Sequence, residues 1–203
     1  MMTDSLIVPR VLAPSNYRRM PWKNGGGFTT EIVVAPPDAA FDAFAWRVSL
    51  ADVDESGPFS AFVDVDRILV LTSGNGMRLT GGDAALDVTQ LYEPVRFAGE
   101  RPLQCALVSG PVRDFNLMVR RDVARGDVHI VRNHAQTLPR ADAYLCYVAR
   151  GAFRCRIAGA PVAALVAEHS LVVEPCGAGS APPLALHARS PDAVALVAAI
   201  EWL

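Results

Sequence analysis

Residues 68–74 read Ile68-Leu69-Val70-Leu71-Thr72-Ser73-Gly74, an apolar run of strand type that ends in a glycine turn. The second half of the chain repeats this pattern in Leu145-Cys146-Tyr147-Val148-Ala149-Arg150-Gly151. In both places a second β-rich run follows the glycine. A strand, a glycine turn and another strand that recur in the same order predict an internal repeat of two half-chains.

Two further correspondences extend this repeat. Leu91-Tyr92-Glu93-Pro94 resembles Val172-Val173-Glu174-Pro175, and the apolar segment from Gln104 to Ser109 resembles that from Ala193 to Ala198. The alternative is that any two β-rich segments align loosely by chance. If the repeat is real, each half-chain of about 100 residues has the size of a compact β domain.

The rest of the chain favours strands as well. Phe153-Arg154-Cys155-Arg156-Ile157 alternates apolar and charged residues, which is typical of a sheet with one buried face. Fifteen glycines and fifteen prolines interrupt the chain too often for long helices. We predict an all-β fold of two barrels or sandwiches, over residues 1–122 and 123–203, that pack together as one compact unit.

Composition narrows the classes of function. The 203 residues carry 19 basic and 21 acidic side chains without a basic cluster, so we expect no nucleic-acid partner. No apolar run reaches the roughly 18 residues of a membrane span, so we expect no membrane partner. The first residues lack the basic and apolar regions of a secretory signal, which makes the cytoplasm the expected location.

The cysteines and histidines do not form a recognisable metal motif. The four cysteines, Cys105, Cys146, Cys155 and Cys176, include no C-x-x-C pair, and the four histidines are scattered singly. We interpret all four cysteines as small buried hydrophobic residues and expect neither a metal nor another cofactor.

The first chemically informative stretch is Trp22-Lys23-Asn24-Gly25-Gly26-Gly27, which leads into a strand containing Thr29 and Glu31. Successive glycines can turn their N–H groups toward an anion, and Lys23 would add positive charge. Both nucleotide-binding glycine motifs are absent, which argues against phosphate. The alternative is a glycine turn before the strand, with Trp22 packed over it.

Two strands carry the other candidate polar groups. Arg47 and Ser49 share one face of the first, and they either point into a barrel or form a solvated face. An interior guanidinium would need a partner such as Glu31 or a ligand carboxylate. Asp114 and Asn116 share one face of the second strand, where they bind a ligand or make hydrogen bonds at the start of the strand.

These motifs together resemble the HutD/Ves family. The resemblance rests on Trp22 to Ile32 with its three glycines, on Arg47-x-Ser49-x-Ala51 followed by Gly57-Pro58-Phe59-Ser60 and Asp66-Arg67, and on Gly110 to Met118. Val63-Asp64-Val65 departs from the Pro-Gly expected before Asp66. The resemblance implies a cupin-type, bicupin-like fold, an association with histidine utilisation, and a role in sensing an intermediate such as formylglutamate.

Our leading hypothesis is a non-catalytic binder of a small anionic metabolite in the N-terminal barrel. The residues predicted to line its ligand site are Trp22, Lys23, Asn24, Gly25, Gly26, Thr29, Glu31, Arg47, Ser49, Phe59, Ser60, Asp114 and Asn116. The alternatives are a metal-free enzyme that uses Glu31 or Asp114 as a general base, and a structural module. Because cupins often pair, the resemblance also implies a homodimer as one arrangement.

Overall fold

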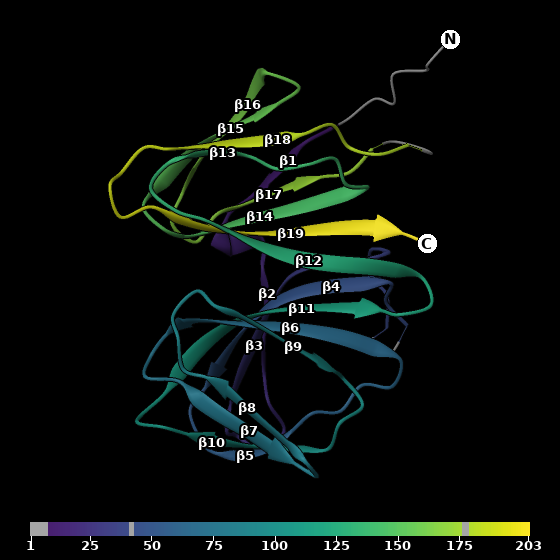
Figure 1. Cartoon of the computed structure of the whole chain (residues 1–203), viewed down its shortest axis with the longest axis vertical. Helices are drawn as coiled ribbons and strands as arrows, with labels where there is room; N and C mark the ends of the chain where they lie inside the picture. The colour runs from purple at the N-terminus through teal and green to yellow at the C-terminus, as the bar shows by residue number, and fades with distance from the viewer. Residues whose placement is uncertain (1–7, 41–42, 176–178) are drawn as a thin grey trace. The chain divides into compact units, whose positions relative to one another are not determined.

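The computed structural model describes residues 8–40, 43–175 and 179–203, and these residues form strands joined by turns (Figure 1). The only helical element among them is a short 3-10 turn, η1 (Pro14–Asn16). The all-β prediction is therefore confirmed. The chain divides into two units, which we call the first barrel (residues 17–125) and the second barrel (described residues 8–16 with 126–202).

The first barrel consists of a six-stranded and a four-stranded sheet. The larger sheet has the order β2-β3-β4-β11-β6-β9, and the smaller one has the order β5-β10-β7-β8. All neighbouring strands are antiparallel. The strands are β2 (Arg18–Pro21), β3 (Gly27–Ala35), β4 (Trp46–Val53), β5 (Gly57–Phe59), β6 (Val65–Ser73), β7 (Met77–Gly81), β8 (Ala84–Val88), β9 (Pro94–Ala98), β10 (Leu103–Leu107) and β11 (Val112–Arg120).

The second barrel has a five-stranded and a four-stranded sheet, in the orders β1-β17-β14-β19-β12 and β13-β18-β15-β16. Its strands are β1 (Arg10–Leu12), β12 (Ala124–Val131), β13 (Ala135–Thr137), β14 (Ala143–Arg150), β15 (Ala152–Ile157), β16 (Ala160–Val166), β17 (Ser170–Val173), β18 (Leu184–Ala188) and β19 (Val194–Trp202). The first barrel ends at residue 125, near the predicted division at residue 122, and β1 belongs to the second barrel because it pairs with β17.

The two barrels share one topology. The order β4-β11-β6-β9 matches β12-β19-β14-β17, and the order β5-β10-β7-β8 matches β13-β18-β15-β16. The glycines of the repeat occupy equivalent turns: Gly74 and Gly151 both have positive φ, 93° and 70°. A Cβ on either would lie 2.9 Å from a Cα of the facing chain, in Val112 and Ala193 respectively. Glycine is therefore required at both turns for the same reason.

Two predicted correspondences within the repeat are wrong. The first is that of Leu91–Pro94 with Val172–Pro175. Val70 pairs with Pro94 at the start of β9, and its equivalent Tyr147 pairs with Ser170 at the start of β17, so the first segment leads into its strand whereas the second contains the end of one.

The second wrong correspondence concerns two apolar strands. The segment from Gln104 to Ser109 contains β10, which lies in the smaller sheet, whereas Ala193 to Ala198 begins β19, which lies in the larger sheet. The equivalent of β19 is β11, and the equivalent of β10 is β18. All of these segments are strongly apolar, and apolar content alone does not distinguish the strands of the two sheets.

Strand register places the inward-facing residues of the first barrel in rows across its larger sheet. One row is Thr29, Ala51, Asp114 and Leu71; the next is Glu31, Ser49, Asn116 and Leu69; the third is Arg47, Met118, Arg67 and Phe97. Apolar side chains of the smaller sheet, Met77, Leu79, Leu103 and Cys105 among them, complete an apolar core with Leu69 and Leu71. Polar side chains from four neighbouring strands thus share a face with this core.

Candidate functional site

Arg47 and Glu31 form an ion pair inside the first barrel. The Nε of Arg47 lies 2.6 Å from Oε2 of Glu31, and the Arg47 residue is only 3% exposed. A register shift in β3 between Glu31 and Val33 changes the alternation of side chains just beyond the acid. Because Arg47 and Ser49 are both buried, they do not form the solvated face that the sequence left open.

Arg67 is the second buried cation, at the start of β6. Its Nε donates to Oδ1 of Asn116 at 3.4 Å, and its Nη1 donates to the backbone carbonyl of Ser60 at 3.0 Å. Its guanidinium carbon lies 4.4 Å from the ring centroid of Phe59, with Phe62 and Phe97 also in cation–π range. Within the described part of the chain, no carboxylate forms an ion pair with Arg67.

Burial strongly affects the ionisation of Arg67. Burial lowers the pKa of Arg67 to about 10, an effect that the charge of Asp114 opposes and that of Arg47 reinforces. The guanidinium still carries its charge at neutral pH. It is therefore a desolvated cation held by neutral groups, and such a cation gains more from a carboxylate than one in water.

Asp114 is a buried acid on β11. The residue is 1% exposed, and neither side-chain oxygen has a hydrogen-bond partner among the described residues. Burial raises the pKa of Asp114 to about 7; the charge of Arg67 opposes this rise, and that of Asp52 adds to it. The alternative predicted for Asp114, a hydrogen bond at the start of its strand, does not apply to this side chain. Near neutral pH it exists in both protonation states.

The glycine-rich segment forms a tight turn between β2 and β3. The N–H of Gly25 donates to the carbonyl of Trp22, and that of Gly26 to Oδ1 of Asn24. These two donors are therefore used within the turn rather than presented to an anion. The indole Nε1 of Trp22 donates to Oγ1 of Thr29 at 2.8 Å, and its ring packs against the apolar core. Lys23 is exposed in the turn.

Of the thirteen predicted site residues, the structure gathers the strand residues on one inward face. These are Thr29, Glu31, Arg47, Ser49, Asp114 and Asn116. Trp22 joins them through Thr29 and Phe59 through Arg67, while Ser60 contributes its backbone carbonyl. Lys23, Asn24, Gly25 and Gly26 lie in the turn and are not brought into this cluster by the contacts described above.

Three further residues, Arg67, Phe62 and Phe97, were not among the predicted site residues. Arg67 is part of the quoted family motif, but residues 68–71, which follow it, are all apolar. Because polar and apolar residues do not alternate there, the sequence does not predict whether Arg67 points inward or outward. Register supplies what the pattern lacked, because Arg67 pairs with Met118, which itself pairs with Arg47. Phe97 pairs with Arg67 from β9.

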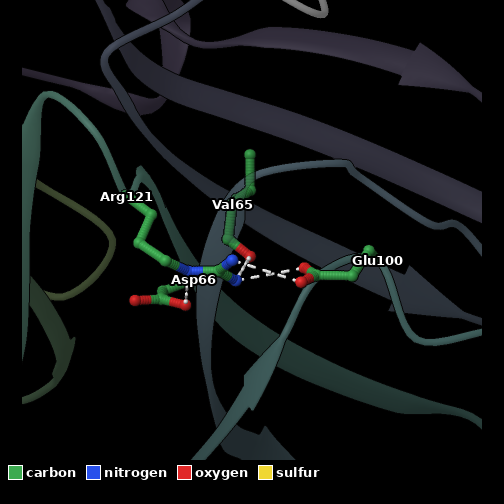
Figure 2. Close-up of polar contacts among 4 residues, drawn as sticks. All are labelled: Val65, Asp66, Glu100 and Arg121. Atoms are coloured by element: carbon green, nitrogen blue, oxygen red, sulfur yellow. Dashed lines mark hydrogen bonds and ion pairs between the residues drawn. The ribbon is translucent and has the colours of Figure 1, made fainter.

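A separate ion-pair network lies at the beginning of β6, on the exposed side. Figure 2 shows Arg121, which contacts Asp66 at 2.9 Å through Nε and Glu100 at 3.1 Å through Nη2. Arg121 also donates to the carbonyl of Val65 at 3.5 Å. This pairing lowers the pKa of Glu100 and raises that of Arg121. The network joins the end of β11 to the residues beside Arg67.

The described residues contain no group of three or more potential ligands that could hold a metal ion. Cys105, Cys146 and Cys155 are free and buried. Burial raises the pKa of Cys105, and a hydrogen bond with Cys155, together with burial, raises the pKa of Cys146. Cys176, the fourth cysteine of the prediction, lies outside the described residues. No helix of the described chain is both long and apolar enough to cross a membrane.

A comparison with known families finds the HutD family over residues 14–193. The chain belongs to the HutD family. A Pseudomonas putida relative, described as an uncharacterised protein in the 3′ region of hutC, is 42% identical over 54% of this chain and 57% of its own length. Protein Ves of Cronobacter sakazakii is 37% identical over 68% of this chain and 77% of its own. The family name and the hutC-region relative link the family to histidine utilisation.

Solved structures support the same assignment. A conserved protein of unknown function from Pseudomonas aeruginosa matches with a TM-score of 0.86 and 30% identity, over 96% of this chain and 99% of its own. HutD from Pseudomonas fluorescens, described for a formate condition, matches with a TM-score of 0.79 and 28% identity over 97% and 100%. Bacillus subtilis oxalate decarboxylase matches with a TM-score of 0.64 over 98% of this chain and 78% of its own. At 8% identity it shares the fold alone. The predicted bicupin-like fold is confirmed.

Proposed function

We propose that the first barrel binds a small carboxylate metabolite of histidine degradation, such as formylglutamate, without catalysing a reaction. Through this binding the protein senses the intermediate and modulates histidine utilisation. The observation that carries the proposal is the buried Arg67 guanidinium, which has only neutral partners among the described residues. A ligand carboxylate would supply the missing negative charge by accepting from the Nη2 side of the guanidinium, since Nε and Nη1 already donate to Asn116 and Ser60.

Neighbouring groups fit the rest of such a ligand. Asn116 and Ser49 stand in the row beside Arg67 and can exchange hydrogen bonds with amide or formyl groups. Phe59 and Trp22 provide apolar surface along the methylene chain. The exposed Lys23 would attract an anion from solution at low ionic strength. We place the thirteen predicted residues and Arg67 in this proposed site, with those of the glycine turn at its margin.

Isothermal titration calorimetry tests the proposal directly. We expect formylglutamate to bind and to raise the melting temperature, with the desolvated arginine–carboxylate contact contributing on the order of 2 kcal/mol to the binding free energy. Glutamate, urocanate and formate serve as comparison ligands. The absence of both heat and melting shift at millimolar concentrations of all four would remove the proposal.

A matched pair of variants then assigns the contact. Arg67→Gln should weaken binding at least tenfold, because the buried charge is lost. Arg78→Gln should bind like the parent, since Arg78 lies on β7 of the same barrel with an exposed side chain paired to Asp87. Equal weakening in both variants would point to the overall charge of the protein instead of this site.

The pKa of Asp114 near 7 favours a second candidate function, a metal-free enzyme that acts on a small carboxylate metabolite. A buried carboxyl that titrates near neutrality is suited to general acid–base catalysis. Product formation from the same four compounds decides between the two functions. Turnover that is lost in Asp114→Asn or Glu31→Gln would establish the enzyme, and an absence of turnover with tight binding would favour the sensor.

A further inference from the structure

We infer that the first barrel takes up its carboxylate ligand together with one proton, and that Asp114 holds this proton. The inference rests on the proposed function and adds the protonation state that the ligand requires. It assigns Asp114 a specificity-determining role, as the group that donates a hydrogen bond to the ligand's anionic oxygen.

The charges inside the barrel support this reading. Glu31 and Arg47 offset each other at 2.6 Å. Arg67 and Asp114 influence each other electrostatically but do not form an ion pair, and both are at least 95% buried. With Asp114 ionised, these four groups sum to zero charge. With Asp114 neutral, they sum to +1, which is the charge that one carboxylate would balance.

Asp52, Cys105 and Arg67 are other titratable groups that act on Asp114 or are acted on by it. Asp52 is paired with Arg113 at 2.5 Å and with Arg19 at 3.6 Å. Cys105, on the opposite sheet, has a pKa of about 11 because of burial and the nearby Asp114 charge, so its thiol remains neutral. Arg67 remains charged at neutral pH. The pKa of Asp114, about 7, lies in the working range.

The proton balance of binding follows. An ionised Asp114 would repel a ligand carboxylate, whereas the neutral acid can donate its O–H to it. An anion that arrives beside Asp114 raises its pKa further, so above pH 7 the side chain takes a proton from solution as the ligand binds. Below about pH 5.5 it is already neutral, and no proton is exchanged. Affinity therefore falls by up to tenfold for each pH unit above 7.

Calorimetry with the carboxylate that binds best in the experiment above tests this inference. At pH 8 the titration is run in phosphate and in Tris, whose ionisation enthalpies differ, so the heats report the protons exchanged. We expect uptake approaching one proton per ligand at pH 8 and close to none at pH 5.5. The Asp114→Asn variant, which keeps a donor without a charge, should show no uptake and should bind more tightly than the parent at pH 8.

The comparison variant is Glu31→Gln, which removes the other inward carboxylate while leaving Asp114 in place. Its pH slope should persist, and loss of the slope in Glu31→Gln but not in Asp114→Asn would overturn the assignment. Binding that does not depend on pH would overturn the inference and leave the proposed function intact. If a variant fails to fold, an NMR titration of the Asp114 carboxyl carbon in the parent protein tests the inference instead. The pKa of Asp114 should rise when ligand is added, and an unchanged pKa would overturn the inference.

Discussion

The two barrels share one topology, but the interior of the first contains charged and polar side chains whereas that of the second is apolar. In the first, Arg67, Asn116 and Asp114 lie on neighbouring strands of the larger sheet. At the equivalent register positions of the second barrel stand Tyr144, Val197 and Ala195, in β14 and β19. The second core is built from apolar residues, and Ser170 is the one polar residue that is buried in the described part of that barrel. Its Tyr144 hydroxyl donates to the carbonyl of Pro139.

This difference separates what the fold needs from what the site needs. The second barrel shows that the strand order closes around apolar residues at these positions. Buried charges are costly, and replacing them by apolar residues of similar volume is often neutral or stabilising. The Arg67–Asp114–Asn116 group is therefore not explained by folding, and ligand binding is the explanation that we propose.

The largest expected effect comes from giving the first barrel the interior of the second. The triple variant Arg67→Tyr, Asp114→Ala and Asn116→Val should lose carboxylate binding by at least about 100-fold, since a desolvated charge contact is removed. Its far-ultraviolet circular dichroism should remain that of a β protein. The matched control is Tyr144→Phe in the second barrel, which should bind like the parent. A triple variant that still binds would show that the site lies elsewhere.

The effect of intermediate size is a pH dependence of the free energy of unfolding, caused by Asp114. The folded pKa of Asp114 is raised from 3.8 to about 7, so between these values the folded chain binds more protons than the unfolded chain. The free energy of unfolding therefore falls as pH rises through this window, by roughly 4 kcal/mol at most. Asp114→Asn should be more stable than the parent at pH 8, and this advantage should be absent at pH 4.

Denaturant unfolding at pH 4, 6 and 8 measures this effect. The equivalent residue in the second barrel is Ala195, which has no titratable group, so this position adds nothing to the pH dependence of unfolding. An advantage of Asp114→Asn that is equal at all three pH values would contradict the assigned cause, since it would then arise from packing rather than from ionisation.

Much of the fold could be predicted because local patterns carry it. The glycines at positions 74 and 151 mark equivalent turns, and the alternation in β15 matches its buried and exposed faces. The departure at Val63-Asp64-Val65 also has a structural counterpart: Asp64 has φ of 58°, a conformation that glycine adopts most readily. What local patterns did not give was which apolar strand belongs to which sheet, as with β10 and β19.

The site was predictable where a strand alternates and not where it is uniformly apolar. Arg47 with Ser49, and Asp114 with Asn116, each occur two apart on one strand, so each pair could be assigned to one face. Arg67 precedes an apolar run, and its inward direction depends on pairing with β11 and β9. Its partners Phe59, Phe62 and Phe97 come from three separate segments, and such contacts are set by tertiary structure.

The smallest expected effect comes from the exposed network of Arg121. Exposed ion pairs contribute little, because water screens them and ordering two long side chains costs entropy. Arg121→Gln removes the contacts with Asp66 and Glu100, which are both exposed, so the denaturant midpoint should change only slightly and less still in 0.5 M salt. Carboxylate affinity should also stay close to that of the parent. A large loss of affinity would show that this surface network positions Arg67, which follows Asp66 on β6. Carboxylate affinity would then not depend on the interior of the first barrel alone.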